Sequence, residues 1–216
     1  MTYPAPESKY NLRGSTFDDA AGVLHLRNAS NTHDFGSSSM SRQELLDGWQ
    51  ARGSDLGTST WVAETAEGKT AGYGEVDLPE GDKPVWVLMW VIPDERGAGI
   101  EAHIIEQAER ATLSRKAESK AEGGPTGTTL FYGRAADKNA GGQQAYEQAG
   151  YSLYLSFQIM QANLEGMPPE PSWPAGIEVR PFVAGTDEQA TYETDEQASE
   201  DKGYHSPLSY EAWVKR

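Results

Sequence analysis

The sequence predicts an α/β fold in which helices flank a mixed sheet. Short β-rich runs alternate with amphipathic helical segments from the middle of the chain onward, which is typical of strands joined by crossover helices. Two such runs, 59–66 and 70–78, are separated only by residues 67–69, as in a hairpin. The run 83–93 is apolar on both faces, which indicates a strand in the middle of a sheet.

The first part of the chain predicts one strand and two helices. A strand is expected at 10–14, and Ser15 and Thr16 indicate the start of the first helix, because hydroxyl side chains cap helix N-termini. A loop of small residues is expected over 28–41. The capping-box spacing Ser-x-x-Glu at its end then predicts a short helix over 41–52.

Four further elements follow the apolar central strand. Apolar residues spaced four, four and three apart predict a helix that begins at Ile100 and fades into a charged, glycine-rich loop over 114–127. A strand over 128–135 and a helix over 139–150 come next, and a β-rich stretch over 151–164 ends this part. The predicted order is therefore β-α-α-β-β-β-α-β-α-β.

A proline-rich segment divides the chain. Four prolines fall within 165–176, which is typical of a stiff linker. We therefore expect a complete domain over 10–165, a linker over 166–176 and an incomplete second unit over 177–216.

The second unit resembles the beginning of the first. Arg180 stands in a strand-like hexapeptide as Arg13 does, and Trp213 begins a W-x-x-R tetrapeptide as Trp49 does, at nearly the same offset. This predicts a degenerate internal repeat that stops after its first strand and helices. An unrelated strand–helix tail is the alternative. The large aromatic side chains of the second unit predict that this unit packs on the first unit or on a second copy of the chain, which would form a homodimer.

The composition narrows the expected partners and location. The chain has 33 acidic and 18 basic residues, so neither nucleic acid nor an anionic membrane is an expected partner, because both bind basic surfaces. The absence of cysteine excludes thiol nucleophiles and cysteine metal sites. The longest apolar run has eight residues and the N-terminus lacks a signal-peptide core, so we expect a cytoplasmic protein. No pair of side chains has the spacing of metal ligands.

Two motifs carry a resemblance to a known family. The first is V-x-P-x-x-R-G-x-G-I over 91–100, at a junction between a strand and a helix. In the second, Asn139 is followed by Tyr146 and then by the pair Gly150 and Tyr151. Each motif alone is a weak signal, but both occur in the right order on a matching β/α string. Through them the chain resembles the GCN5-related N-acetyltransferases (GNAT).

The resemblance implies a fold, an activity and a cosubstrate. The GNAT fold has a mixed central sheet in which two parallel strands splay apart, and acetyl-CoA lies between them. The implied activity is transfer of its acetyl group to a primary amine of a small molecule or peptide, without a metal. The duplicated beginning also resembles tandem GNAT proteins, of which this chain would hold a first domain and the start of a second.

The first motif predicts where acetyl-CoA binds. Gly97 and Gly99 would let the backbone approach the pyrophosphate, which the free N–H groups at a helix start favour. The backbone of the preceding strand would hydrogen-bond the pantetheine arm. A glycine-rich helix start without a ligand is the alternative. The expected cofactor-binding residues are Val91, Ile92, Arg96, Gly97, Ala98, Gly99, Ile100, Glu101 and Asn139.

Glu101 departs from the family pattern, which prefers Gly or Ala at that position. A carboxylate in the first turn of a helix gains about 0.3–1 kcal/mol from the helix dipole. About 5 Å from a pyrophosphate charge, at an effective dielectric near 20, it is repelled by roughly 3 kcal/mol. We therefore expect a site that binds acetyl-CoA with weakened affinity.

Tyr146 and Glu75 are the expected catalytic residues. A neutral phenol can donate a proton to a departing thiolate, and the resemblance assigns this role to Tyr146, whose alternative is a buried core aromatic. Glu75 is the candidate general base because residues 84–93 of the central strand include no ionisable side chain. Asp77 is less favoured, and a solvated strand position explains either residue as well. Asn139 would contact the pantetheine or only cap its helix.

Two other functions stay open. A catalytically degenerate domain with a structural or partner-binding role is favoured by Glu101, by Gly142 within the last helix and by the missing base on the central strand. A dinucleotide-binding domain is the more distant alternative, because the turn lacks the third glycine of that fingerprint.

Overall fold

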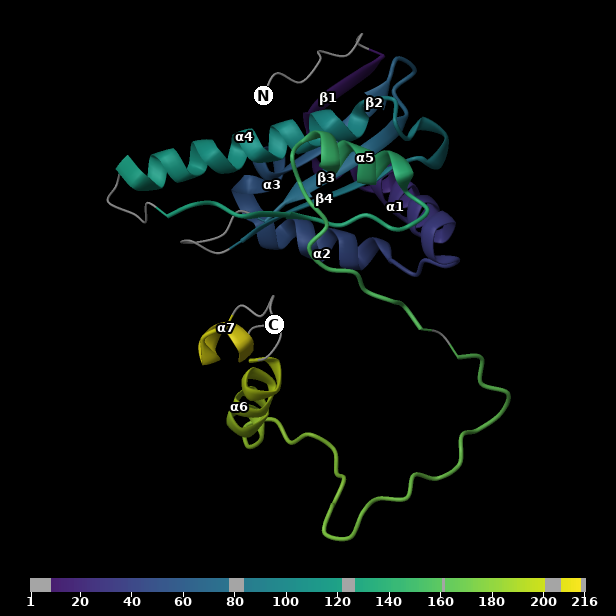
Figure 1. The fold of residues 1–216 in the computed structure, drawn as a ribbon, viewed down its shortest axis with the longest axis vertical. Coiled ribbons are helices and arrows are strands. Elements are labelled where there is room, and N and C mark those ends of the chain that lie inside the picture. The colour runs from purple at the N-terminus through teal and green to yellow at the C-terminus, as the bar shows by residue number, and fades with distance from the viewer. Residues whose placement is uncertain (1–8, 78–83, 122–126, 161, 201–206, 215–216) are drawn as a thin grey trace. The chain divides into compact units, whose positions relative to one another are not determined.

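The computed structural model describes residues 9–77, 84–121, 127–160, 162–200 and 207–214. These residues divide into two compact units, Met1–Leu155 and Ser156–Arg216 (Figure 1). The predicted sheet and its flanking helices lie in the first unit.

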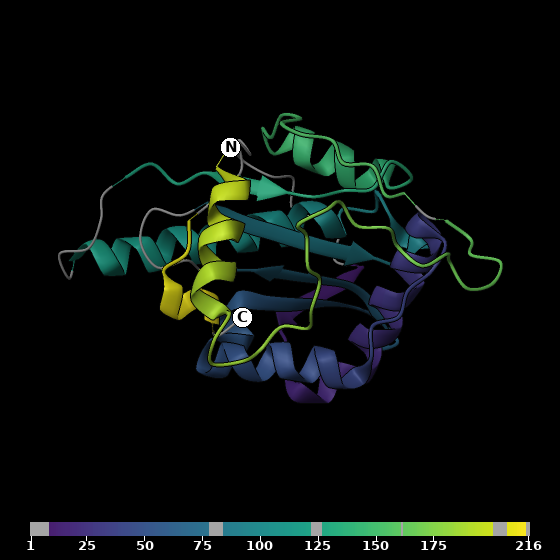
Figure 2. The ribbon, with the colours of Figure 1, turned by 90° about the horizontal axis from the view of Figure 1, so that it is seen from below.

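The first unit is built on a five-stranded mixed sheet. The strands lie in the order of the sequence; neighbours are antiparallel from the first to the fourth, and the last pair is parallel (Figure 2). The predicted hairpin and the interior apolar strand are therefore confirmed. The strands are β1 (Tyr10–Gly14), β2 (Thr60–Thr65), β3 (Thr70–Val76), β4 (Val85–Val91) and β5 (Phe131–Gly133).

Helices cover both faces of this sheet. One face packs against α1 (Ala20–Phe35) and α2 (Arg42–Arg52), and its core includes Trp49 and Tyr73. The other packs against α4 (Ile100–Ala121) and α5 (Ala140–Gln148), and its core includes Ile104. The short α3 (Leu56–Ser59) and three single-turn 3₁₀ segments, Phe17–Asp19, Gly53–Asp55 and Pro93–Glu95, complete the unit.

Two glycines of β3 let α4 approach the sheet closely. A Cβ atom built on Gly72 would lie 2.4 Å from a side-chain carbon of Ile100, and one on Gly74 would lie 2.1 Å from Ile104. These separations are far inside van der Waals contact. The close contact fixes the start of α4 beside the end of β4.

Both helices next to predicted loops are longer than the sequence suggested. The loop expected over 28–41 was wrong in its first half, because α1 continues to Phe35 and ends where Gly36 adopts a left-handed conformation. The loop expected over 114–127 was wrong at its start, because α4 continues to Ala121 through Ala, Lys, Glu and Arg, which are strong helix formers. The capping box was right: Ser41 Oγ accepts from Glu44 N–H.

The β-rich stretch predicted over 151–164 does not form a strand among its described residues. It begins beside the short β5, which offers few backbone partners. Tyr154 stacks on Tyr132 of β5 with ring centroids 5.7 Å apart, and Tyr132 lies 5.3 Å from Trp86 of β4. Aromatic contacts therefore hold the beginning of this stretch near the sheet edge.

The described residues of the second unit form two helices, α6 (Glu188–Ser199) and α7 (Tyr210–Val214). The ring of Tyr192 on α6 packs against Tyr210 and Trp213 of α7. The hexapeptide 177–182, predicted as a strand, has no strand structure, because no described segment of this unit pairs with it.

Candidate functional site

The parallel strands β4 and β5, at one edge of the described sheet, stop pairing part-way along β4, and we call this point the divergence. They pair only from Val85 to Val87, whereas β4 continues to Val91. The N–H of Ile92 donates to Ala71 O of β3, and Trp86 O accepts from the N–H of Asp77, the residue after β3, so the even-numbered residues of β4 bond on the β3 side. The backbone groups of odd-numbered residues beyond Val87 therefore face the diverging side, where β5 supplies no partner.

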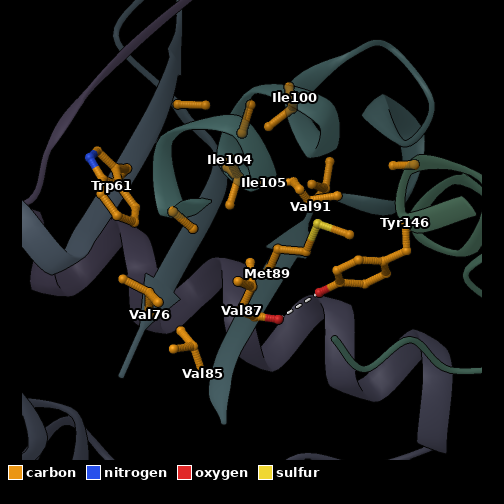
Figure 3. Close-up of a cluster of buried hydrophobic side chains, with 14 residues drawn as sticks. Trp61, Val76, Val85, Val87, Met89, Val91, Ile100, Ile104, Ile105 and Tyr146 are labelled. Carbon is orange, nitrogen blue, oxygen red and sulfur yellow. Dashed lines mark hydrogen bonds between the residues drawn. The ribbon is translucent and has the colours of Figure 1, made fainter. Parts of the chain in front are cut away.

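Tyr146 lies at the point where the strands separate. Its hydroxyl donates to the carbonyl of Val87 at 2.7 Å (Figure 3). Burial raises the pKa of Tyr146 above its usual value, and a hydrogen bond from the backbone of Arg134, just after β5, acts in the opposite direction. The ring fills the space above Gly133, where a Cβ would lie 2.2 Å from it. The phenol thus joins the two strands where their own pairing ends.

The turn between β4 and α4 has the conformation that its glycines predict. Gly97 and Gly99 have φ of 76° and 94°, in the left-handed region, and α4 begins at the next residue. Apart from the glycine itself and its two neighbours, no heavy atom of the described residues lies within 4 Å of a Cβ built on either glycine. We call residues 96–99 the glycine turn; its outer side is open.

The carboxylate of Glu101 occupies the inner side of the glycine turn. The N–H of Gly97 donates to Glu101 Oε1 at 3.0 Å. The side chain is buried, with the whole residue 2% exposed, and Oε2 has no hydrogen-bond partner among the described residues. An N–H group of the turn is therefore already bound to an anion of the chain itself.

Arg96 points away from the open side of the turn. Its two terminal nitrogens donate to the carboxylate oxygens of Asp34 at 2.7 and 3.0 Å, and one also donates to Ser30 Oγ at 2.8 Å. Nε donates to Val91 O at 3.3 Å. The side chain is 7% exposed, so its charge is paired and buried against α1.

Asn139 caps the helix that carries Tyr146. Its Oδ1 accepts from Gly142 N–H at 2.9 Å, and a Cβ on Gly142 would lie 2.7 Å from Nδ2. The side chain therefore has a structural role in starting α5, and Gly142 is required by that cap.

Glu75 belongs to a polar chain on the other face of the sheet. Trp49 Nε1 donates to Tyr73 Oη at 3.0 Å, and this hydroxyl donates to Glu75 Oε2 at 2.8 Å. Arg27 and Arg52 approach the same carboxylate oxygen to 3.6 and 3.9 Å. Glu75 also lines a pocket of about 230 Å³, which these two arginines border.

The sequence-predicted residues form two groups. Tyr146, Asn139 and the glycine turn lie together around the end of β4 and the core that includes α4. Glu75 follows Tyr73 on the side of the sheet that packs against α1 and α2, so the structure does not bring it to Tyr146. Asp77, the less favoured base, is bound to Arg52 at 2.8 Å.

The sequence reasoning missed Ser30 and Asp34. Both were placed in a loop, although a helix through this segment puts them four residues apart on one face, where Arg96 binds both. Within the described residues, no three carboxylate or histidine side chains are arranged to hold a metal ion, and none of the helices is long and apolar enough to cross a membrane.

Comparison with known proteins gives consistent matches. No protein-family model matches the chain. A mycothiol acetyltransferase from Geodermatophilus obscurus is 29% identical over 183 residues, which cover 82% of this chain and 53% of the relative. A GCN5-related N-acetyltransferase from Sphaerobacter thermophilus has a TM-score of 0.72 at 25% identity, covering 98% of this chain and 64% of that one.

A third match supports the fold. The Salmonella typhimurium protein yncA, whose structure contains acetyl-CoA, has a TM-score of 0.53 at 16% identity, covering 68% of this chain and 82% of that one. The chain thus spans about half of the curated relative and less than two thirds of the first structure. With the mixed sheet, its parallel last pair of strands and the flanking helices, these matches show that the chain has the fold of the GCN5-related N-acetyltransferases and is similar in sequence to an acetyltransferase.

Proposed function

We propose that the chain is an acyl-CoA-dependent N-acetyltransferase that transfers the acetyl group of acetyl-CoA to a primary amine of a small molecule or peptide. The observation that carries the proposal is the divergence of β4 and β5 beyond Val87, which leaves one edge of β4 without a strand partner. The relatives named as acetyltransferases support it. Acetyl-CoA supplies an acetyl thioester, and the chain supplies its binding, orientation and proton transfer.

The residues around the end of β4 fit the pantetheine arm of acetyl-CoA but not its pyrophosphate. The backbone groups of Met89 and the N–H of Val91 offer a pantetheine arm hydrogen bonds of the kind that a further strand would make, whereas Val91 O already accepts from Arg96 Nε. The glycine turn does not fit a pyrophosphate as it stands, because Glu101 binds the Gly97 N–H and Arg96 is paired with Asp34.

Tyr146 is the proposed acid, and Glu75 stays the proposed base although it lies on the α1 and α2 face of the sheet and Tyr146 on the face of α4 and α5. Tyr146 holds its proton firmly, since burial raises its pKa, and it lies where the strands diverge. That proton is donated to Val87 O, so acting as an acid requires Oη to exchange this acceptor for the leaving sulfur. Glu75 borders the pocket on the α1 and α2 face, where an amine would meet a carboxylate beside two arginines.

A catalytically degenerate domain with a structural or partner-binding role is the second candidate. Glu101 inside the glycine turn and the buried pairing of Arg96 favour it. An acetylation screen separates the two: full-length chain, acetyl-CoA and a panel of small amines and peptides, with release of free CoA thiol as the readout. Amine-dependent release supports the enzyme. Its absence at millimolar acetyl-CoA across the panel contradicts it.

We also propose that residues 177–216 repeat the beginning of the first domain. In the first unit, Arg13 forms a two-pronged pair with Asp19 at 2.6 and 2.8 Å and donates to the carbonyl of the next residue. The N–H of Thr16 donates to the same carboxylate. Arg13 also binds Glu64 of β2 at 2.6 Å, which ties the motif to the sheet.

The same pattern recurs in the second unit. Arg180 pairs with Asp187 at 2.5 and 2.7 Å and donates to the carbonyl of the next residue, and the N–H of Val183 donates to that carboxylate. No described residue takes the place of Glu64, and the Arg180 side chain is half exposed. This geometry supports the repeat over an unrelated tail, and it favours a covering surface supplied by another part of the chain or by a second copy.

A further inference from the structure

We infer that Glu101 is a built-in anion of the glycine turn, which excludes the pyrophosphate of CoA from the wild-type site and confines acyl-donor recognition to the pantetheine arm. The inference rests on the proposed function, because it concerns how the same site selects its acyl donor. It assigns to Glu101 the role of a specificity-determining residue.

Glu101 and a bound phosphate compete for one hydrogen-bond donor. A phosphate oxygen bound at the turn needs the N–H groups at the start of α4. The Gly97 N–H already donates to Glu101 Oε1 at 3.0 Å, and a second anion cannot take the same donor while the carboxylate stays. Like charges at contact distance also repel, so the carboxylate opposes a phosphate through its charge as well as its position.

The carboxylate of Glu101 is also enclosed by the chain. Glu101 is 2% exposed, and its Oε2 is buried without a hydrogen-bond partner among the described residues. A Cβ built on Gly141, at the start of α5, would lie 2.8 Å from Gly97 N and 3.1 Å from Glu101 Oε1. The glycine turn and α5 therefore close over the carboxylate, and moving it outward requires the two segments to separate.

The one basic side chain of the glycine turn is not free to receive the phosphates. Arg96, the basic residue of the motif, is held by Asp34 and Ser30 and is buried against α1. Its pairing also removes the charge that would offset Glu101. A pyrophosphate would thus meet an uncompensated carboxylate.

The test compares two ligands on three forms of the full chain. Isothermal titration measures CoA and pantetheine, which lacks the pyrophosphate, on wild type, Glu101→Ala and the control Glu106→Ala. Glu106 lies on α4 in an exposed pair with Arg110, so its removal changes the net charge equally without touching the turn. We expect wild type and the control to bind CoA no tighter than pantetheine. Glu101→Ala should bind CoA at least tenfold tighter than wild type, about 1.4 kcal/mol, with pantetheine unchanged.

Glu101→Gln is a second variant in case Glu101→Ala fails to fold, because glutamine keeps the acceptor for Gly97 N–H and removes the charge. This variant should also bind CoA more tightly than wild type does. Wild type that binds CoA tenfold tighter than pantetheine, or Glu101 variants without a gain, would overturn the inference. Acetyl transfer is scored separately. If the Glu101 variants gain CoA affinity but no form transfers an acetyl group, the inference stands and the proposed function is contradicted. If acetyl transfer occurs but the variants gain no CoA affinity, the proposed function stands and the inference is contradicted.

Discussion

Replacing Tyr146 by Phe removes one hydroxyl at the point where β4 and β5 separate. That hydroxyl donates to Val87 O at 2.7 Å and accepts from the backbone of Arg134. A buried carbonyl left without its donor costs about 1–3 kcal/mol, whereas the Arg134 N–H lies at an exposed residue and can find water. We therefore expect Tyr146→Phe to lower the free energy of unfolding by about 1–3 kcal/mol, by loss of the bridge rather than of packing.

Urea denaturation followed by far-UV circular dichroism measures this change. Tyr132→Phe is the matched control, because Tyr132 packs through its ring on Trp86 and its hydroxyl has no hydrogen-bond partner in the described chain. The control should change stability by less than about 0.5 kcal/mol. If Tyr146 also donates its proton during acetyl transfer, turnover should fall about 10²–10⁴-fold. Unchanged stability would refute the bridging role, and full activity would remove Tyr146 from the chemistry.

Three further changes test the packing, the charge network and the second unit. Gly74→Ala places a Cβ 2.1 Å from an α4 side chain and should lower the free energy of unfolding, measured in urea, by about 1–3 kcal/mol. The control Gly48→Ala, in open space on α2, should raise it by about 0.5–1 kcal/mol. Equal effects of the two changes would contradict the close approach of α4 to β3. Arg13 holds the pKa of Asp19 below its usual value, so this pair stabilises the fold above about pH 4, and the contribution is lost as the pH falls further. Asp19→Asn should lower the free energy of unfolding at pH 7 and make its decrease at acid pH less steep. An unaltered decrease at acid pH would rule out this contribution of the pair. Deleting 166–216 should lower the melting temperature and change the elution volume in size-exclusion chromatography if this segment packs on the first unit or on a second copy, and unchanged values would refute that role.

The sequence predicted the elements whose signals are local. The capping box at Ser41, the hairpin of β2 and β3 and the interior position of β4 all follow from patterns within a few residues. The extents of α1 and α4 were missed, because composition alone did not show that small or charged residues continue a helix. The strand expected after Gly150 failed for another reason: a β-rich stretch needs a neighbour to pair with, and β5 has only three residues.

The candidate site was predictable in position and less so in detail. The sequence placed the glycine turn before α4, and the resemblance to the family singled out Tyr146 and drew attention to Glu101. It could not show that the carboxylate turns inward onto Gly97, since a first-turn glutamate is equally stable facing water. Nor could it show that Arg96 is held by α1, because that contact joins residues more than sixty positions apart.

The central claim is that the edge of β4 exposed by the strand divergence receives the pantetheine arm of an acyl donor. Amide nitrogen–proton NMR spectra of the full chain, titrated with S-acetyl-pantetheine, test it most directly. The N–H groups of Met89 and Val91 face the divergence, whereas those of Leu88 and Trp90 face β3. We predict large shifts and slowed hydrogen exchange at Met89 and Val91 and little change at Leu88 and Trp90. No response along β4 at millimolar ligand, or equal responses at all four amides, would contradict the claim.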